Sequence, residues 1–463
     1  MVDEWRQVKL EDVAHELTVG YVGSMTSEYI ESGVPFLRSK NVNPLNINTN
    51  DIKYISDGFH KRISKSRLTP GDVVIVRTGK PGTCAVVPNW LIDANCSDLV
   101  IVRCGPDINN RFLAYYINTV ATGHVYAHLV GAVQQHFNVG SARSLKINLP
   151  PIAEQEKIVR ILGAIDDKIE LNRRMNETLE AMAQTLFKSW FVDFDPVIDN
   201  ALAAGIEIPD ALQGRADTRQ TLGEDRKLLP EAIRQQFPSS FDYSEEMGWI
   251  PEGWEEKTLD EATSLIIDHR GKTPKKMGGE WSMSGYPAIS AKNIKSRRLV
   301  RPETIRFVDD ELYAKWMKDP LQPGDIVMTS EAPLGELYYI SGKNDFLLSQ
   351  RLYGIRANKN IGNGNYLFHW FQTKRAQSDL SNRATGTTVV GIRQSELRKV
   401  TVLCPHTELS DLFSNHADEY LYKIAQNVFQ NDDLAKLRDI LLPKLLSGEL
   451  RIPDAEKLIQ DVT

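Results

Sequence analysis

The segment "LTPGDVVIVRTGKPGTCAVV" (residues 68–87) decides the fold, because a close variant, "LQPGDIVMTSEAPLGELYYI" (321–340), occurs later in the same chain. In both copies a Pro-Gly-Asp turn precedes a run rich in β-branched residues. Such a run after a turn predicts a buried strand. The match therefore predicts an internal repeat, which is the first feature to establish in a chain of this length.

The similarity extends on both sides of this segment. The further matching pairs are "GVPFLRSKNV" (33–42) with "GYPAISAKNI" (285–294), "FLAYYINT" (112–119) with "YLFHWFQT" (366–373), and "GAVQQHFNVGSARSLKINLP" (131–150) with "GTTVVGIRQSELRKVTVLCP" (386–405). Each copy continues into a long helical pattern. The chain therefore contains one unit twice, and each unit is a globular part followed by a helix.

Short β-rich runs alternate with short helical segments in each globular part, which favours an α+β or α/β-like fold. The predicted cores include Val73, Ile75, Leu99 and Ile101 in one copy and Ile326, Met328 and Leu348 in the other. The predicted organisation is a globular domain (1–150), a long helix (151–193), a linker with one or two short helices (194–248), a second globular domain (249–405), a second long helix (406–451) and a tail (452–463).

The long helix raises three possibilities: a core helix, a cofactor-binding helix or a spacer. Its apolar residues recur in steps of three and four, a heptad pattern with Asn172 as the polar interruption. At about 1.5 Å per residue it would extend roughly 60 Å, more than one small domain can cover. It therefore needs a partner, and the second helix carries a similar stripe that includes Leu412, Tyr420, Ile424, Leu434, Leu437 and Leu441.

The composition is that of a globular protein, with 41% hydrophobic and 25% charged residues and a formal net charge of −6. The sequence has no apolar run of about eighteen residues and no secretory leader pattern, so we expect a cytoplasmic protein without a membrane span. The four cysteines have no paired spacing and are expected to be buried thiols. Two stretches, 60–67 and 291–301, are basic and free of acids.

With the repeat and the helices established, the chain resembles the specificity subunit of type I restriction-modification enzymes, the HsdS family, over nearly its whole length. The motifs that carry this resemblance are "LPPIAEQEKIVRILGAIDDKIELNRRMNETLEAMAQTLFKSWFVDFDP" (149–196), "IPEGWEEKTLDEA" (250–262), "KLRDILLPKLLSGELRI" (436–452) and the pair "PFLRSKNV"/"PAISAKNI". The first long helix carries a Glu-Gln pair after "LPPIA", whereas the second has "HTELSDLF" instead.

The resemblance implies two target-recognition domains, each recognising one half of a split, asymmetric sequence in double-stranded DNA. Two long antiparallel helices would separate them, forming a coiled-coil spacer, and would dock two modification (methyltransferase) subunits and, through these, restriction subunits. The chain itself would be non-catalytic and bind no cofactor. The partner methyltransferase would use S-adenosylmethionine, and the restriction subunit would use ATP and Mg²⁺.

DNA contacts require side chains that match base edges or phosphates, chiefly Asn, Gln, Arg, Lys, Ser and Thr. By motif position and residue type, the candidates are Arg38, Ser39, Lys40, Asn41, Arg62, Lys65, Arg77, Lys80, Gln134, Gln135 and His136 in the first domain, and Lys272, Lys275, Lys292, Asn293, Arg297, Arg298, Thr387, Thr388, Arg393 and Gln394 in the second. Any single cation could equally be a solvated surface charge, and the "SKN"/"AKN" pair could equally be a structural turn.

The helix stripes supply the candidates for helix pairing and subunit docking. These are Ile158, Ile161, Ile165, Ile169, Asn172, Leu179, Leu186, Trp190, Leu412, Tyr420, Leu434, Leu437 and Leu441.

No catalytic or metal site is predicted. "GTTVVGIR" (386–393) lacks the Lys and the hydroxyl of a phosphate-binding loop, and neither "LPPI" nor "DFDP" fits the loop with which an adenine methyltransferase holds its flipped base. Two alternatives remain open at this point: a self-contained DNA methyltransferase or nuclease, and a coiled-coil scaffold that does not bind DNA.

Overall fold

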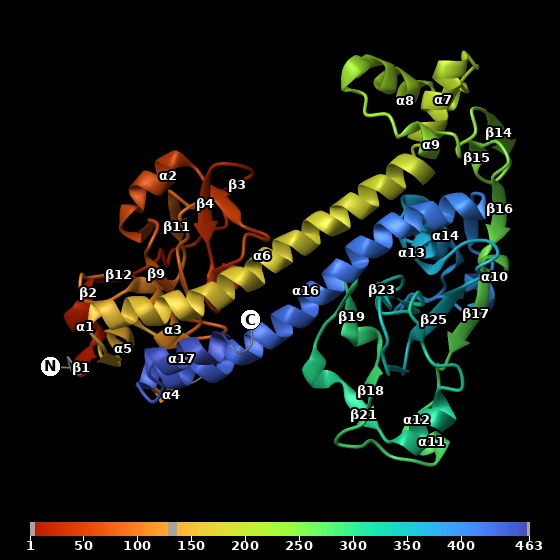
Figure 1. Ribbon diagram of the computed structural model, residues 1–463. Helices are drawn as coiled ribbons and strands as arrows, with labels where there is room; N and C mark the ends of the chain where they lie inside the picture. The colour runs from red at the N-terminus through yellow and green to blue at the C-terminus, as the bar shows by residue number, and fades with distance from the viewer. Residues whose placement is uncertain (1–4, 128–136, 461–463) are drawn as a thin grey trace. The chain divides into compact units, whose positions relative to one another are not determined.

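The computed structural model describes residues 5–127 and 137–460. The chain divides into two compact units, one formed by residues 1–172 with 429–463 and the other by 173–428. Each unit contains a globular part and portions of two long helices, α6 (Ile152–Phe191) and α16 (Thr407–Ser447) (Figure 1). Within the described ranges, no helix combines the length and the apolar character needed to cross a membrane.

The first unit is built on two sheets. A four-stranded antiparallel sheet has the order β10 (Cys84–Val86), β9 (Val73–Val76), β12 (Leu99–Cys104), β2 (Ala14–Val19), and a five-stranded sheet has the order β3 (Tyr29–Ile30), β7 (Lys53–Ile55), β4 (Val34–Leu37), β11 (Ala94–Cys96), β8 (Arg67–Leu68). Two short pairs complete it, β1 (Arg6–Lys9) with β13 (Lys146–Leu149) and β5 (Val42–Asn43) with β6 (Asn46–Ile47). Its helices include α1 (Leu10–Val13), α2 (Asp57–Arg62), α3 (Asn110–Thr119), α4 (Thr122–Ala127), α5 (Val139–Arg143) and α17 (Ile452–Gln460).

The second unit repeats this plan. Its four-stranded sheet has the order β17 (Thr263–Asp268), β25 (Leu352–Ala357), β22 (Ile326–Thr329), β23 (Leu337–Tyr339), beside a three-stranded sheet of β21 (Arg306–Val308), β18 (Tyr286–Ile289) and β24 (Leu347–Leu348). The short pairs are β16 (Glu255–Thr258) with β26 (Thr401–Cys404), β19 (Ile294–Lys295) with β20 (Arg298–Leu299), and β14 (Phe241–Ser244) with β15 (Gly248–Pro251). Its globular helices include α10 (Leu259–Ala262), α11 (Pro274–Met277), α12 (Asp310–Trp316), α13 (Gly364–Trp370), α14 (Lys374–Arg383) and α15 (Gln394–Leu397).

The internal repeat is confirmed by the strand order of the four-stranded sheets and by one parallel strand pair. The order β10-β9-β12-β2 recurs as β23-β22-β25-β17, and the parallel pair β4–β11 recurs as β18–β24. The Pro-Gly-Asp turns are equivalent too. The Asp72 carboxylate accepts a hydrogen bond from Thr69 N at 3.0 Å, and that of Asp325 accepts one from Gln322 N at 2.8 Å. The seven predicted core residues are all buried: Val73, Ile75, Leu99, Ile101, Ile326, Met328 and Leu348.

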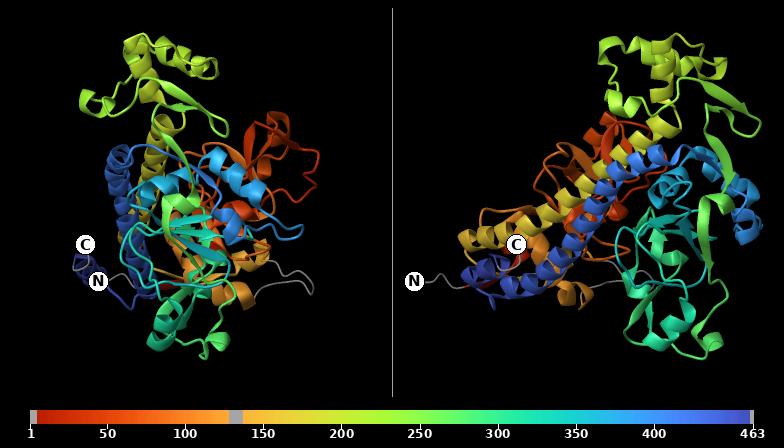
Figure 2. Two further views of the ribbon diagram at one scale, coloured as in Figure 1. Left: turned by 90° about the vertical axis from the view of Figure 1, so that its right-hand side faces the viewer. Right: turned by 45° about the vertical axis from the view of Figure 1, so that its right-hand side comes forward.

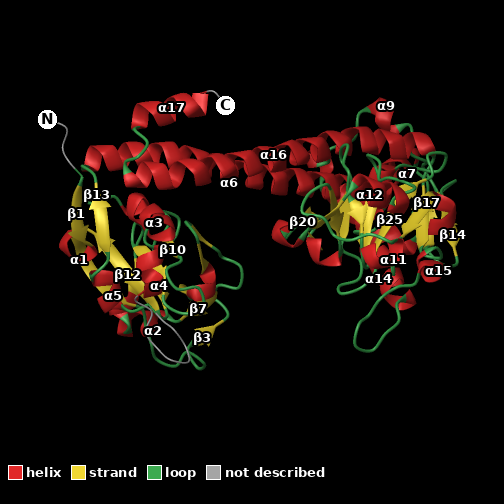
Figure 3. Cartoon of the chain, turned by 90° about the horizontal axis from the view of Figure 1, so that it is seen from below, coloured by secondary structure: helices red, strands yellow, loops and turns green. Residues whose placement is uncertain are grey.

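The helices α6 and α16 pair in antiparallel fashion within each unit (Figure 3). In the first unit Asp166 pairs with Arg438 at 3.1 Å, and Asn172 Nδ2 donates to Gln430 Oε1 at 2.8 Å. In the second unit Asn427 Nδ2 donates to Asn176 Oδ1 at 2.7 Å. Residue numbers therefore increase along α6 in the direction in which they decrease along α16.

The predicted stripe on α6 is correct up to Asn172. Beyond it, the predicted Trp190 is buried, and the predicted Leu179 and Leu186 are half-buried beside other seam residues. The buried positions continue as Asn176, Ala183 and Phe187, whereas Met182, which continues the apolar pattern in the sequence, is 47% exposed. A strict heptad runs through 172, 176, 179 and 183. Inspection of the sequence favoured the larger apolar side chains over Asn and Ala, although helix geometry places the smaller ones at the seam.

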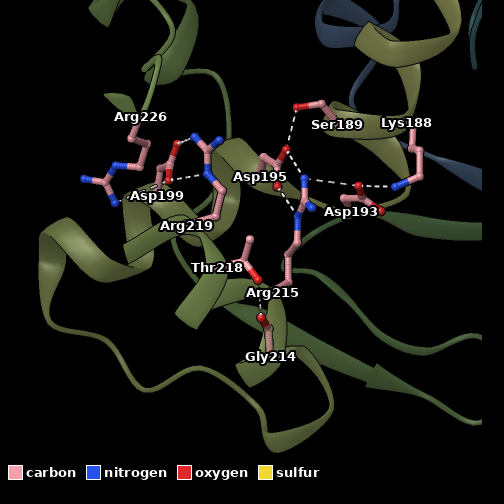
Figure 4. Close-up of polar contacts among 10 residues, drawn as sticks. All are labelled: Lys188, Ser189, Asp193, Asp195, Asp199, Gly214, Arg215, Thr218, Arg219 and Arg226. Atoms are coloured by element: carbon pink, nitrogen blue, oxygen red, sulfur yellow. Dashed lines mark hydrogen bonds and ion pairs between the residues drawn. The ribbon is translucent and has the colours of Figure 1, made fainter. Parts of the chain in front are cut away.

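The segment after α6 is folded rather than a simple linker. It forms α7 (Asp195–Ala204), α8 (Asp210–Thr221), α9 (Glu231–Arg234) and the β14–β15 hairpin, and Figure 2 shows these yellow-green helices beyond the end of α6. Two buried carboxylates hold it together (Figure 4). Asp195 accepts two hydrogen bonds from Arg215, at 2.7 and 2.8 Å, and Asp199 is paired with Arg219.

Aromatic packing ties this folded segment to the end of α6. Trp190 and Phe191 belong to a core cluster that also contains Phe194, Phe237 and Trp254. Residues 194–248 have a polar composition, which suggested a linker. The segment folds nevertheless, because ion pairs within it and packing against residues outside it stabilise it.

Candidate nucleic-acid interface

The paired "SKN" and "AKN" motifs form structural turns. Asn41 and Asn293 each occupy the third position of a 3₁₀ turn and are fully buried. The Asn41 amide donates to Asn48 O at 3.1 Å and accepts from Arg38 N at 3.0 Å. The Asn293 amide donates to Thr304 Oγ1 at 2.9 Å and accepts from Ser290 N at 3.1 Å. Base contact and a structural turn were equal alternatives for these two residues, and the structure favours the turn, because both amides are buried and hydrogen-bonded within the chain.

The neighbouring cations of the first domain surround one carboxylate. Arg38, Lys40 and Lys53 all pair with Asp51, Arg38 at 3.3 Å and Lys53 at 3.4 Å. The hydrogen bond from Lys40 is the main cause that lowers the pKa of Asp51 to about 2. Three positive charges thus share one negative charge, which leaves this surface basic. Lys53, which sequence reasoning missed, joins the group through the fold, while Ser39 is half-buried beside it.

Among the other first-domain candidates, Lys65 and Lys80 are exposed, and Arg62 is exposed and lies over the Phe59 ring at 4.8 Å. Arg77 is different. It pairs with Asp98, donates to Phe137 O at 3.2 Å, and keeps only 16% of its side chain exposed. Arg77 therefore holds the scaffold together, which corrects its assignment as a contact. Gln134, Gln135 and His136 lie outside the described residues.

In the second domain, Arg297 and Arg298 do not face solvent freely. Both arginines lie at the β19–β20 hairpin and pair with Glu180 of α6, at 3.0 and 3.4 Å. They fasten the hairpin to the helix, while 35% and 42% of their side chains stay exposed, so their role as DNA contacts stays a prediction. Lys272 donates to Trp316 O at 3.2 Å, and burial, with Lys318 nearby, lowers the pKa of Lys272. Lys275 and Lys292 are exposed.

The loop before α15 and the first residue of that helix hold the remaining second-domain candidates. Thr387, Thr388 and Arg393 are exposed there, and Gln394 donates to Ile266 O at 3.3 Å. The loop borders a hollow of about 370 Å³ that Ala332, Pro333 and Leu334 line from the opposite side. This hollow could not have been predicted, because the two segments are distant in sequence.

The docking candidates on the helices are largely occupied by the helix pair itself. Ile158, Ile161, Ile165 and Ile169 pack with Leu441 in the core of the first unit, and Trp190 is buried in that of the second. Leu179, Leu186, Leu412, Tyr420, Leu434 and Leu437 are partly buried. The large apolar side chains that α6 and α16 leave exposed are others, namely Ile152, Leu171, Met182, Tyr422, Val428, Phe429 and Ile440.

The described residues contain no cluster of three or more His, Cys, Asp or Glu side chains that could hold a metal ion. Glu255 and Lys257, which resemble part of a nuclease triplet, pair with each other at 2.5 Å on β16. The four cysteines are free thiols, three of them buried, as expected from their spacing.

Comparison with known proteins shows which family shares this sequence pattern. The family model for the type I restriction modification DNA specificity domain matches residues 2–181 and again 251–416. The specificity subunit of the type I restriction enzyme HindI from Haemophilus influenzae is 28% identical over 330 residues, which is 67% of this chain and 70% of that protein. The MjaIX specificity subunit from Methanocaldococcus jannaschii is 22% identical over 470 residues, covering 97% and 94% of the two chains.

Among solved structures, the S subunit of a type I restriction-modification system from M. genitalium has a TM-score of 0.54 at 12% identity, with 96% of each chain covered. This likeness concerns the fold alone. The family model matches most of the chain, in two copies that coincide with the repeat. The chain therefore belongs to the type I restriction-modification DNA specificity family.

Proposed function

We propose that this chain is the non-catalytic specificity subunit of a type I restriction-modification complex, and that each globular domain recognises one half of a bipartite, asymmetric DNA target. The observation that carries the proposal is the repeated scaffold: one strand order occurs twice, while the surface loops differ between the copies. A shared scaffold with different loops suits two readers of different sequences.

The helix pair supports the second part of the proposal, in which α6 and α16 set the number of unrecognised base pairs. The 40 residues of α6 form one unbroken helix, about 60 Å long at 1.5 Å per residue. Its apolar seam and the bonded pair Asn176–Asn427 would favour stiffness in such a spacer. A stiff rod is what a fixed spacing requires.

Docking of two methyltransferase subunits, and of restriction subunits through them, is proposed for the exposed apolar side chains of the helices. Phe429 is 70% exposed and Tyr422 61% exposed, both on α16. Because Tyr422 and Phe429 lie two helical turns apart, they share one face of α16, and neighbouring exposed apolar side chains can form a contact surface. The partner methyltransferase would supply S-adenosylmethionine chemistry, the restriction subunit would use ATP and Mg²⁺, and the complex would act in the cytoplasm of a bacterium or archaeon.

DNA affinity would come first from phosphate contacts. Arg38, Lys40 and Lys53 outnumber the one carboxylate they share, and the exposed Lys65, Lys80, Lys275, Lys292 and Arg393 add to the charge. Such contacts are independent of sequence and sensitive to salt. Loop side chains, including Thr387 and Thr388, would then supply recognition of bases.

The decisive experiment compares the methylome of the host with and without this chain. We expect one split adenine-methylation motif to disappear on deletion and to return on complementation. The tagged chain should also co-purify with a methyltransferase. A methylome unchanged by deletion would refute the proposal, and methylation or cleavage by the chain alone would favour a self-contained enzyme.

A further inference from the structure

The loop of residues 385–391 in the second unit presents two valines to solvent. Val389 is 45% exposed and Val390 is 49% exposed, directly after the exposed Thr387 and Thr388. Single exposed apolar residues are ordinary, but adjacent ones beside a hollow indicate a contact surface. The pair is therefore a candidate contact surface.

The loop is held in a defined shape. Thr385 N donates to Gly391 O at 2.8 Å, Gly391 N donates to Thr385 O at 3.0 Å, and Ile392 N joins the loop to Ser330 O at 2.9 Å. Gly386 has a φ of 121°, and a Cβ atom there would lie 2.1 Å from Val389 O. Because the loop is already closed by these hydrogen bonds, binding through the valines would lose little conformational entropy.

The lining of the hollow beside the loop is mainly apolar. Pro333, Leu334 and Leu380 line it together with Val389 and Val390, and Gln377, Ser381 and Thr388 add polar groups. It has room for a methyl group and the ring edge that carries it.

The corresponding loop in the first domain has different chemistry. In the sequence, "GAVQQHFN" (131–138) aligns with "GTTVVGIR" (386–393), so that Gln134 and Gln135 correspond to Val389 and Val390. The described residue that follows this loop confirms the alignment, since Phe137 N donates to Arg77 O at 3.0 Å just as Ile392 N donates to Ser330 O. The glutamines themselves lie outside the described residues.

This difference distinguishes DNA from a protein as the occupant. If both loops docked the same protein subunit, their side chains should be of the same type in the two copies. If the loops recognise two different half-sites, their side chains should differ. Glutamine suits the hydrogen-bonding edge of adenine, and an apolar side chain suits the methyl group of thymine.

We infer that Val389 and Val390 contact the 5-methyl group of a thymine in the major groove of the half-site that the second domain recognises. The inference rests on the proposed function, which supplies the DNA. Thymine is the one standard base with a methyl group on its major-groove edge. The hydroxyls of Thr387 and Thr388 would bond neighbouring base edges or phosphates.

The test uses the assembled complex of this chain with its methyltransferase subunits and a duplex that carries the target defined by the methylome. Each thymine of the second half-site is replaced in turn by deoxyuridine, which pairs identically but lacks the methyl group. We expect about fourfold weaker binding at one or two positions, as for the loss of one buried methyl group. The Val389→Ser/Val390→Ser variant should bind the thymine duplex and the deoxyuridine duplex equally.

Val22→Ser is the matched control, because Val22 is 70% exposed in the first unit. That variant should keep the full deoxyuridine effect. If no deoxyuridine duplex binds more weakly to the unaltered complex, or if the double variant keeps the effect, the inference is wrong while target binding and the proposed function stand. Loss of the methyltransferase subunits from the double variant would assign the valines to a protein contact and overturn the inference. Failure of the unaltered complex to bind DNA in a salt-sensitive way would refute both.

Discussion

Asn427 donates a hydrogen bond of 2.7 Å to the Oδ1 atom of Asn176, and both amides are buried between the two long helices. One turn away along α6, Asn172 is buried and bonded to Gln430 and Asn431. Buried amides in a coiled-coil seam favour one register over others at a cost in stability. The sequence predicted this role for Asn172, and the structure adds Asn176.

The first prediction concerns this pair. Replacing Asn427 alone with Leu should lower the free energy of unfolding by about 1–3 kcal/mol, because it leaves the Asn176 amide buried without a partner. Replacing both Asn176 and Asn427 with Leu should restore most of the loss. Urea unfolding measures both, and Gln426→Leu at an exposed neighbouring position is the control. A double variant less stable than the single one would contradict the argument.

The second prediction separates turn formation from DNA contact. Asn293→Ala should destabilise the second domain by about 2 kcal/mol, because several backbone groups lose their partner. Lys292→Ala, at the exposed adjacent position, should leave thermal unfolding unchanged and weaken DNA binding. Unchanged stability of Asn293→Ala would show that the Asn293 amide does not hold the turn together.

The third prediction concerns pH. Burial by itself would raise the pKa of Asp195, but hydrogen bonds from Arg215 and Ser189 outweigh it and hold the pKa below its ordinary value. A carboxyl with a lowered pKa stabilises the folded state above its unfolded pKa of about 3.9, and this contribution is lost as the pH falls further. Asp195→Asn should therefore lose about 2 kcal/mol at neutral pH and show a flatter fall in stability below pH 4. Asp210→Asn, on the exposed side of α8, should behave like the parent.

The fourth prediction concerns docking. Phe429→Ser should unfold at the same temperature as the parent and co-purify with less methyltransferase, since its side chain is 70% exposed. Lys423→Ser, exposed on the same helix, should keep the methyltransferase. Ile165→Asp should instead unfold the helix pair, because Ile165 is 4% exposed in the core. Full co-purification by Phe429→Ser would move the docking surface elsewhere.

The fifth prediction concerns the Asp51 cluster. Lys40→Ala should weaken binding to all DNA sequences alike and reduce the salt slope of the binding constant by about one. Asp51→Asn should strengthen binding to all DNA sequences and increase the salt slope, because it releases three cations from a shared carboxylate. Gel-shift titrations at several salt concentrations measure both slopes. A change in the methylated motif with Lys40→Ala would show that Lys40 contacts a base.

Sequence reasoning succeeded where local patterns carry the information. The β-branched runs after Pro-Gly-Asp became β9 and β22, and the heptad pattern became the seam through Ile158 and Ile165. At Asn41 and Asn293 it left a structural turn and a base contact equally open, because a short polar residue in a turn has the same appearance whether it is buried or exposed, and the structure selects the turn. Sequence reasoning failed at residues 194–248, because Asp195 and Asp199 find their arginines 20 positions away.

The sequence by itself determined that the chain contains two copies of one domain, each followed by a long helix, because repetition and hydrophobic period are local properties. Only the tertiary structure decided which polar side chains remain available to DNA. Arg298 pairs with Glu180, 118 positions away, and Arg103 faces Glu16 from a neighbouring strand, 87 positions away. Whether a charge is free depends on partners that the fold brings from distant parts of the chain, so its availability emerges only when the chain has packed.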